Sequence, residues 1–500
     1  MNAARPDGTR RILFPNLLVI GGPMYFEFSN TEELSGKTFP HFRNMKKIIA
    51  LIALFAVLWA AWYFFACTLV KIPDIPENQK AVFILEQTGC VLCHDKSAKP
   101  PFYASIPLVG SLVKSDMSEG LKSFDIGPTM KEIAEGKPVN ETILAKIEHA
   151  VNAGTMPPFA FVAVHANRKM SADGREILMK WIASERGRLN KNSGVAKEFA
   201  NEPVWPIPEK LEVEAEKVKL GQILYHHTAL SGDNTVSCAT CHPLEKGGVD
   251  GLQTSVGIRK QKGEINAPTV YNAAFNKRQF WNGRAADLAE QAGGPPMNPV
   301  EMDGVSWEEI AKRLSADAAF KKQFEAVYPD GFTEKNITDA IAQFEKTLIT
   351  PNSPFDRYLR GDKSALTADQ IRGYELFKLH NCAICHAGQN LGGQTFEYMG
   401  LKRNYFADRG NVGKIDDTGL KSFTNDERDM HKFKTPTLRN VALTAPYFHD
   451  GSTQSLKNAV SVMAKYQRGK TLSSNDIECI VKFLESLTGE LEGKLLKKVQ

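Results

Sequence analysis

One run of apolar positions stands apart from the rest of the chain. Residues 48–70 carry no charged side chain, and as a helix this run would be about 35 Å long, enough to cross the hydrocarbon core of a bilayer. Lys46 and Lys47 precede it, which predicts a cytoplasmic N-terminus and a periplasmic remainder. A cleaved signal peptide is the alternative, but its apolar core is normally shorter. We therefore interpret residues 45–72 as a single-pass anchor in the inner membrane, and residues 1–44 as an upstream extension that is either non-native or disordered.

Beyond this run, apolar positions recur with the period of short amphipathic helices. Ile337–Leu348 and Asp476–Leu487 show this spacing most clearly, and Leu456–Tyr466 also has a helical pattern. Gly221–Tyr225 and Gly373–Phe377 resemble one another, and each lies shortly before a cysteine motif. Few stretches alternate as strands do, so the pattern predicts a mainly α fold.

The second half of the chain contains an internal duplication. Residues 267–272 (APTVYN) align with residues 435–440 (TPTLRN), and residues 280–283 (FWNG) align with residues 448–451 (FHDG) at the same offset. A constant offset over separate segments indicates two copies of one structural unit.

Six of the eight cysteines fall into three Cys-x-x-Cys-His motifs. Chance, zinc binding or redox chemistry could explain one such motif, but three with a histidine directly after each indicate covalent attachment of c-type haem. The thiols bond the haem, and the histidine binds its iron. Covalent attachment takes place outside the cytoplasm, which requires an exported chain. The motifs are Cys90/Cys93/His94, Cys238/Cys241/His242 and Cys382/Cys385/His386.

The motifs and the duplication together divide the chain. We predict an N-terminal monohaem cytochrome domain at 73–188, a Pro-rich linker at 189–210, and duplicated haem domains at 211–360 and 361–500. The predicted fold is therefore a transmembrane helix followed by three c-type cytochrome-like domains that are mainly α.

The first haem has a candidate for its sixth iron ligand in Met156. This residue lies in the segment GTMPP, where proline stiffens the loop that would bring the sulfur to the iron. His149 and His165 are rival ligands. Ordinary packing of Met156 is the remaining alternative.

The last haem has its best sixth ligand in Met463, which follows the duplicated segment. The rivals are Met399, Met430 and His449. A histidine and a methionine on one iron raise its potential and suit electron transfer.

The haem of the middle domain has no such partner. The position aligned with Met463 is Pro295, and we expect the nearby Met297 and Met302 to have packing or loop roles. This haem is therefore predicted to be open to a small oxygen ligand.

Polar side chains near this open haem fit peroxide chemistry. Glu301 could move a proton between the two oxygens of peroxide, and Gln291 could hold the peroxide by a hydrogen bond. On the residues alone, both could equally be surface groups. Trp281 could pack in the core or serve as an aromatic step between two haems.

The composition limits the classes of molecule that this chain is expected to bind. The formal net charge is +5 and no basic run suits a nucleic acid. The 28 Phe and 6 Trp fit a chain that encloses large apolar cofactors. Cys479 lies on an apolar helix face and is expected to be an inert core thiol.

The duplicated region closely resembles the di-haem cytochrome c peroxidases of bacteria. The resemblance rests on SGDNTVSCATCH, NAPTVYNAAFN, QFWNGRA, EQAGGP, NPVEM, TAPYFHDG and AVSVMAKYQRG, and it covers more than half of the chain. With the anchor and the extra haem domain, the chain is similar to the tri-haem, membrane-anchored quinol peroxidase branch.

This resemblance implies roles for particular residues. Gln291 and Glu301 would be catalytic, Trp281 would lie between the two haems, and Met463 would bind the iron of the electron-transfer haem. The resemblance also implies a calcium ion between the domains. It would be held by the Asn266 side chain and by the carbonyl groups of Thr444 and Pro446, with waters completing its shell.

One position departs from the family pattern. Many members carry a distal histidine in the loop after the first motif of the pair, where this chain has Ile258. Isoleucine cannot bind iron. We therefore predict that this protein needs no reductive activation.

The sequence thus predicts a periplasmic peroxidase with three covalent haems and a Ca²⁺ ion, which reduces hydrogen peroxide with electrons from quinol. A small soluble cytochrome c as donor is an alternative, and so is an electron conduit without catalysis. A homodimer is a further open alternative.

Overall fold

The computed structural model describes residues 40–66, 70–410 and 415–497. The chain divides after residue 68 into two units, which we describe separately. The first contains α1 (Pro40–Ala66). Residues 1–39 of the predicted extension, and residues 67–69 of the predicted anchor, lie outside the described residues. Within the described ranges, none of the helices has the length and apolar character that a bilayer crossing requires.

The second unit is mainly helical, as predicted. Strands are confined to two short antiparallel pairs in the described part of the chain. Phe396 of β1 (Phe396–Tyr398) pairs with Lys434 of β2 (Lys432–Lys434), and Glu490 of β3 (Glu490–Leu491) pairs with Leu495 of β4 (Lys494–Leu495).

The first haem motif lies in a small helical domain with its own core. Ile84, Leu144 and Leu178 are among the residues that form this core. The motif itself is a single short helix, α3. The helices are α2 (Glu77–Gln87), α3 (Cys90–His94), α4 (Val109–Ser123), α5 (Gly127–Ala134), α6 (Glu141–Ala153), α7 (Phe159–Val164) and α8 (Ala172–Leu189).

The second motif lies in a domain whose core includes Leu224, Ile258, Met302 and Ile341. The packing role expected for Met302 is thereby confirmed. The helices are α9 (Ala215–His226), α10 (Cys238–Cys241), α11 (Leu288–Met297), α12 (Trp307–Ser315), α13 (Ala318–Glu325) and α14 (Glu334–Glu345).

The third motif lies in a domain whose core includes Phe377, Cys479 and Phe483. Cys479 is 5% exposed, as expected for a core thiol. The helices are α15 (Pro354–Leu359), α16 (Ala368–Leu379), α17 (Tyr405–Arg409), α18 (Lys421–Thr424), α19 (Leu456–Arg468) and α20 (Ser474–Glu485).

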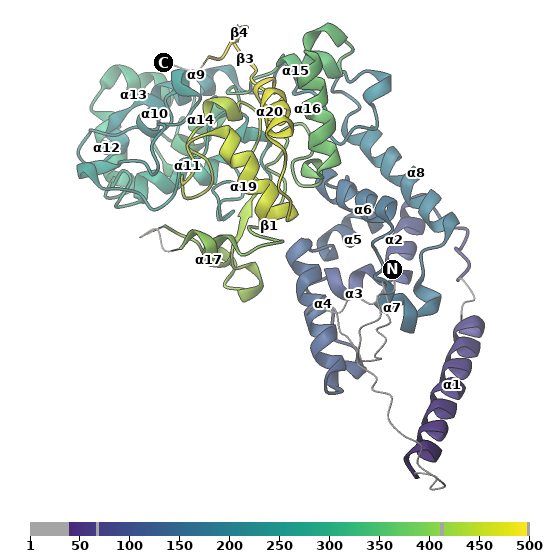
Figure 1. Ribbon diagram of the computed structural model, residues 1–500. Helices are drawn as coiled ribbons and strands as arrows, with labels where there is room; N and C mark the ends of the chain where they lie inside the picture. The colour runs from purple at the N-terminus through teal and green to yellow at the C-terminus, as the bar shows by residue number, and fades with distance from the viewer. Residues whose placement is uncertain (1–39, 67–69, 411–414, 498–500) are drawn as a thin grey trace, which may run out of the picture. The chain divides into compact units, whose positions relative to one another are not determined.

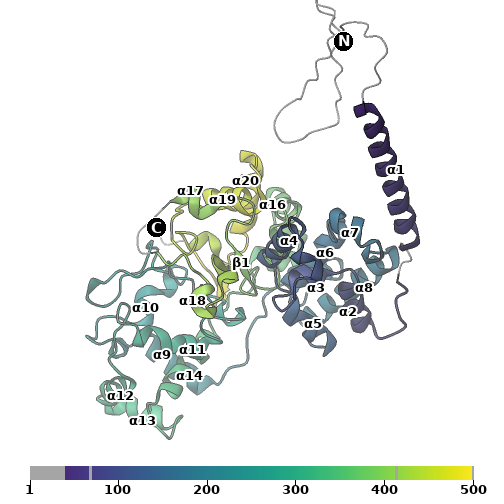
Figure 2. The ribbon, with the colours of Figure 1, turned by 90° about the horizontal axis from the view of Figure 1, so that it is seen from below.

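A matched helix crossing builds each of the two duplicated domains. α9 packs on α14, and α16 packs on α20, and the latter pair lies side by side in both views (Figures 1 and 2). A Cβ atom at Gly221 would lie 1.8 Å from the Ala340 carbonyl oxygen, and one at Gly373 would lie 1.9 Å from that of Cys479. Glycine is required at both crossings because the helices approach too closely for any side chain.

The duplicated loops also share their backbone conformation. Asn272 and Asn440 have φ of 61° and 60°, and Phe280 and Phe448 have φ of 66° and 73°. An isolated bridge pairs Gln279 with Ala285, and its counterpart pairs Tyr447 with Thr453. These pairs keep the offset found in the sequence, so the structure bears out the internal duplication.

The two copies meet at Thr350. Its hydroxyl accepts hydrogen bonds from Asn272 Nδ2 (2.8 Å) and from Asn440 Nδ2 (3.0 Å). Asn272 Oδ1 accepts from the Thr350 amide, and Asn440 Oδ1 accepts from the Gly489 amide. Thr350 and Gly489 are thus equivalent positions in the two copies.

The segment predicted as a linker, residues 189–210, is packed rather than free. Val204 and Ile207 are fully buried. The Trp205 carbonyl accepts a hydrogen bond from Arg439, whose guanidinium also forms an ion pair with Asp356 at 2.7 Å. The apolar residues among the prolines explain this packing, since Val204 joins the core of the last domain and Ile207 packs against Phe275 and Ile349 of the middle domain.

Candidate active site

The histidines of the two duplicated motifs are oriented by backbone carbonyl groups. His242 Nδ1 lies 3.2 Å from the Gly248 oxygen, and His386 Nδ1 lies 3.1 Å from the Leu391 oxygen. A hydrogen bond from Nδ1 fixes the tautomer and leaves Nε2 for a metal. Burial lowers the pKa of both imidazoles, which favours the neutral form that binds iron.

The thiols of these two motifs are shielded from solvent. Burial is the main cause that raises the pKa of Cys238, Cys382 and Cys385 to about 12. Among the residues that the structure describes, no group of three or more His, Cys, Asp or Glu side chains could hold a metal ion. Two thiols and an oriented histidine fit covalent haem.

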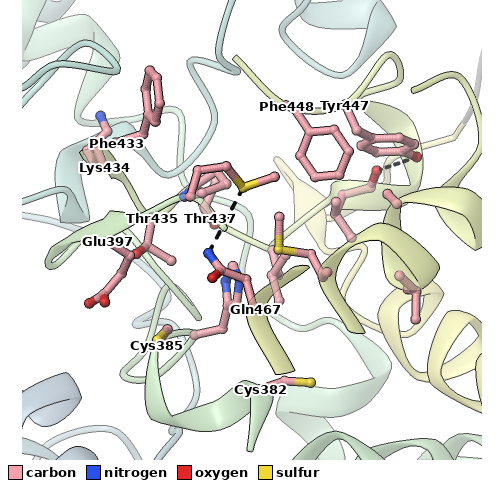
Figure 3. A pocket seen from close by; sticks show the side chains of 18 of the residues that line it. Cys382, Cys385, Glu397, Phe433, Lys434, Thr435, Thr437, Tyr447, Phe448 and Gln467 are labelled. Carbon is pink, nitrogen blue, oxygen red and sulfur yellow. Dashed lines mark hydrogen bonds between the residues drawn. The ribbon is translucent and has the colours of Figure 1, made fainter. Parts of the chain in front are cut away.

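A cavity of about 280 Å³ lies beside the third motif, and it is lined by Cys382, Cys385 and His386. In Figure 3 the two cysteines lie on the side of this cavity opposite Tyr447 and Phe448. The lining is largely apolar, which suits a haem. Met463, from α19, lines the same cavity, as the predicted iron ligand must.

The rivals of Met463 are differently placed. Met399 also lines the cavity, and Gln467 Nε2 lies 4.0 Å from its sulfur (Figure 3). His449 Nε2 lies 2.9 Å from Asp417 Oδ1 and is engaged there. Met430 is not among the lining residues. Met463 remains the best candidate.

At the first motif, His94 is buried and its ring lies 4.5 Å from that of Phe124. Its Nδ1 lacks a hydrogen-bond partner among the described residues. Met156 is 39% exposed and precedes α7. α7 comes close to the motif, since a Cβ at Gly89 would lie 3.0 Å from the Phe161 ring.

The two rivals of Met156 have partners elsewhere. His165 Nδ1 lies 3.0 Å from the Phe161 oxygen and its Nε2 lies 3.2 Å from the Tyr103 hydroxyl. His149 Nε2 lies 3.3 Å from Asn381 Nδ2. Met156 stays the prediction for the first haem.

Glu301 lies close to the second motif. Its carboxylate is near enough to Cys238 and Cys241 to raise the pKa of both thiols. Asn298 Nδ2 donates to Glu301 Oε1 at 2.8 Å. Burial raises the pKa of Glu301, while Arg284 and Asn298 oppose that shift. Glu301 thus lies within electrostatic reach of the second motif, and its acid–base role stays a prediction.

Gln291 lies on α11, and the loop that follows this helix contains Glu301. Asp287 caps this helix, since its side chain accepts from the Glu290 amide at 2.9 Å. The aligned residue of Met463, Pro295, lies near the end of the same helix. Neither Gln291 nor Glu301 is fully exposed, so the alternative of two surface groups is not favoured.

Trp281 and the three predicted calcium ligands line the cavity of the third motif together. Trp281 Nε1 donates to the Asn266 carbonyl at 2.8 Å, and Asn266 Nδ2 donates to the Leu252 and Gln253 carbonyls. The Asn266 amide nitrogen is thus used within the protein. The other two ligands, Thr444 and Pro446, line this cavity as well.

Ile258 is completely buried in the core of the middle domain. Its backbone amide donates to the Glu301 carbonyl at 2.9 Å. Gln261 Nε2 donates to the Pro299 carbonyl at 2.9 Å, which ties the same two loops together. The loop around Ile258 is therefore tied to the backbone of Glu301 and Pro299.

Two polar features were missed by sequence reasoning. Glu345 is buried near Cys238, and Lys146 of α6 forms a buried ion pair with Glu397 of β1 at 2.7 Å. A single acid or lysine inside an amphipathic helix carries no signal of burial. Comparison of the two copies could have found Glu345, because an apolar residue stands at the equivalent position.

Comparisons with known proteins agree with this site. A model of the di-haem cytochrome c peroxidase family matches residues 215–364, and a model of a haem-binding domain matches residues 69–184. Cytochrome c peroxidase Ccp of Escherichia coli (strain K12) is 49% identical over 422 residues, or 84% of this chain and 90% of that protein. Cytochrome c551 peroxidase of Nitrosomonas europaea is 42% identical over 318 residues, 63% of this chain and 92% of that protein.

A solved structure of a MauG-like protein associated with microbial copper homeostasis is also similar. It has 28% sequence identity and a TM-score of 0.50, and the match covers 57% of this chain and 93% of that one. Fold and motifs define a peroxidase enzyme that carries c-type haem. The chain belongs to the di-haem cytochrome c peroxidase family.

Proposed function

We propose that this protein is a membrane-anchored peroxidase with three c-type haems, which faces the periplasm and reduces hydrogen peroxide to water with electrons from quinol. The observation that carries the proposal is the position of Glu301, whose backbone is held by the Ile258 loop and whose carboxylate is within electrostatic reach of Cys238 and Cys241. A buried carboxyl at the haem without a methionine, and Met463 at the other, assign different tasks to the two copies.

A haem held by Cys238, Cys241 and His242 would supply an iron that binds one peroxide oxygen and passes electrons to the O–O bond. Glu301 takes the proton from the oxygen nearest the iron and returns it to the departing oxygen, which leaves as water. Gln291 donates a hydrogen bond that orients the peroxide. Burial raises the pKa of Glu301 toward the working pH, which suits a group that must both accept and release a proton.

Several contacts hold these side chains in place. Asn298 donates to the Glu301 carboxylate, and Ile258 donates to its backbone carbonyl. Because Ile258 is a core residue, this loop holds no ligand that would have to leave before peroxide binds. We therefore expect the oxidised protein to turn over without prior reduction.

Electrons reach this haem from the haem of the last domain. Trp281 lines the cavity of that haem and is fixed by its hydrogen bond to Asn266. An indole in this position suits a step between the two haems. The three predicted calcium ligands line the same cavity, so a bound Ca²⁺ would hold the Trp281 segment and the last domain together.

The N-terminal domain is in contact with the last domain, which supports an electron relay from the first haem. Lys146 pairs with Glu397, and both contribute to the electrostatics of the third motif, where they shift the pKa of Cys385 in opposite directions. Lys146 also lowers the pKa of His94. This ion pair therefore lies between the first and third haem motifs.

The apolar run at residues 48–70 supports the membrane anchor and hence a donor dissolved in the membrane. Relatives named cytochrome c peroxidase favour a second candidate, in which a small cytochrome c delivers the electrons. The first haem would then receive them from the periplasm.

The experiment is peroxide consumption by the detergent-solubilised, oxidised protein, with a reduced quinol as sole donor. We expect turnover without a lag. Turnover only with a reduced small cytochrome would move the donor to the periplasm, and turnover only after reductive activation would contradict the role given to Ile258. If the protein consumes no peroxide with any donor, the remaining alternative is an electron conduit without catalysis.

A further inference from the structure

Glu345, the last residue of α14, is a buried acid that the peroxide chemistry does not use. It is 5% exposed, and its Oε2 has no hydrogen-bond partner within the described ranges. A buried polar group without a partner destabilises the fold. An ionisable side chain in such a place therefore points to a functional role.

Glu345 faces the attachment site of the middle haem. It raises the pKa of Cys238, on α10, and that of Tyr225, on α9. The Tyr225 hydroxyl in turn donates to the His242 carbonyl at 2.6 Å. Burial alone raises the pKa of Glu345 itself to about 8, with no contribution from any charged side chain. Cys238 and Tyr225 belong to a hydrophobic cluster that also contains Val270, Tyr271 and Leu348.

The internal duplication shows what the other copy has at this position. Gly221 contacts Ala340 and Phe344, and Gly373 contacts Cys479 and Phe483 in the same way. The residue after Phe344 is Glu345, and the residue after Phe483 is Leu484.

Leu484 lines the haem cavity of the last domain and is 4% exposed. The equivalent position in the middle domain, Glu345, therefore faces the middle haem. One pocket is apolar there, and the other carries a carboxyl group.

We propose that Glu345 is the proton acceptor coupled to reduction of the haem held by Cys238 and Cys241. When one electron enters that haem, one proton from water binds the Glu345 carboxylate, so the charge of the pocket stays constant. Deprotonation of Glu345 stabilises the oxidised haem and protonation stabilises the reduced haem. This inference needs the haem but not the peroxide chemistry of the proposed function, and it goes beyond that function.

The test is a spectroelectrochemical titration of the full-length holoprotein from about pH 6 to about pH 10, around the carboxyl's pKa. In the unmodified protein, the equilibrium constant for reduction of the middle haem should fall up to tenfold for each unit by which the pH rises. For a one-electron couple, this corresponds to a drop in reduction potential of about 59 mV. In Glu345→Gln and Glu345→Leu, the part of this slope that belongs to Glu345 should be lost, and any remaining slope belongs to Glu301, the other carboxyl near Cys238. The haem of the last domain serves as an internal reference in every titration.

Glu216→Gln is the matched control, because Glu216 lies on α9 with an exposed side chain paired to Lys219. It should keep the slope of the unmodified protein. A flat response in the unmodified protein would overturn the proposal, and so would an unchanged slope in Glu345→Gln.

A second measurement avoids dependence on the variants. The infrared difference spectrum between the oxidised and reduced protein should show a protonated carboxyl band on reduction. If that band is absent across the whole pH range of the titration, the proposal is wrong even where the variants fail to take up haem. Neither measurement uses peroxide or quinol, so an error in the proposed function would leave both results readable.

Discussion

At the scale of single residues, the two copies differ in few side chains but in decisive ones. Met463 occupies the copy that would transfer electrons, and Pro295 stands at the aligned position of the other. Glu345 and Leu484 stand at equivalent positions of the two copies. The same backbone therefore gives two haem sites of different chemistry, because the protein changes only the groups that meet the haem.

Replacement of Glu301 by Gln removes the proposed proton carrier while keeping its shape. Peroxide turnover should fall by about 10²–10⁴-fold, the usual contribution of general acid–base catalysis. Steady-state kinetics would measure this loss. Glu290→Gln is the control, because Glu290 is an exposed neighbour on α11 and should leave turnover within about twofold.

The acid limb of kcat/KM should report the pKa of Glu301. The carboxylate form accepts the proton, so activity is lost as the pH falls through this pKa. Since burial raises the pKa, the limb should lie above that of an ordinary glutamate. Asn298→Ala removes a hydrogen bond that lowers the pKa, and it should move the limb further upward. A limb that does not respond to this change would exclude Glu301 as its source.

Arg439 is expected to contribute to the stability of the fold. It is completely buried, pairs with Asp356, and donates to the Gln389 and Trp205 carbonyls. Arg439→Ala leaves Asp356 buried and unpaired, which should lower the free energy of unfolding by about 3–5 kcal/mol. Urea denaturation would measure it. Lys482→Ala, which breaks an exposed pair with Asp369, should cost less than about 1 kcal/mol.

At the scale of elements, the glycine crossings position the haem motifs. α9 and α16 each lead toward a motif, and each is held against its partner helix without an intervening side chain. The paired glycines and the helical spacing were visible in the sequence, so these helices and the duplication could be predicted. The contact itself could not be predicted, because an unremarkable alanine and cysteine supply the carbonyl groups.

Gly373→Ala tests the crossing of α16 and α20. The added Cβ would meet the Cys479 carbonyl at 1.9 Å, so the helices must separate. We expect a loss of about 1–3 kcal/mol or more and a lower thermal midpoint. Gly187→Ala on α8 is the matched control, since nothing lies within 4 Å of its added Cβ. It should stabilise the protein by about 0.5–1 kcal/mol. Equal effects of the two changes would contradict the crossing.

At the scale of the whole molecule, single side chains form contacts between the domains that we predicted from the sequence. Lys146 reaches Glu397, Lys96 reaches Asp429 at 2.7 Å, and Lys432 donates to the Leu121 carbonyl at 3.0 Å. These contacts link residues far apart in the chain. Motifs revealed the haem-binding residues because their spacing is local, whereas partners such as Lys146 and Glu397 become visible only when the fold brings them together.

Lys146→Met should weaken the contact of the N-terminal domain with the last domain. It leaves Glu397 buried without its cation, and each 1.4 kcal/mol of lost contact free energy lowers the joined population about tenfold. Stopped-flow reduction of the last haem through the first should slow by at least about tenfold. Lys180→Met, at an exposed pair with Glu176, is the control and should leave the rate unchanged. An unaltered rate in Lys146→Met would exclude this contact from the electron route.

Thr350 and Gly489 meet where the two copies join, and their difference has a consequence for ancestry. A Cβ atom at Gly489 would lie 2.0 Å from the Thr350 carbonyl oxygen, while the Thr350 hydroxyl serves an asparagine from each copy. Two identical copies with threonine at both positions could not close this joint. Two identical copies with glycine at both positions would lack the hydroxyl that both asparagines share, so the joint in its present form needs different residues on its two sides.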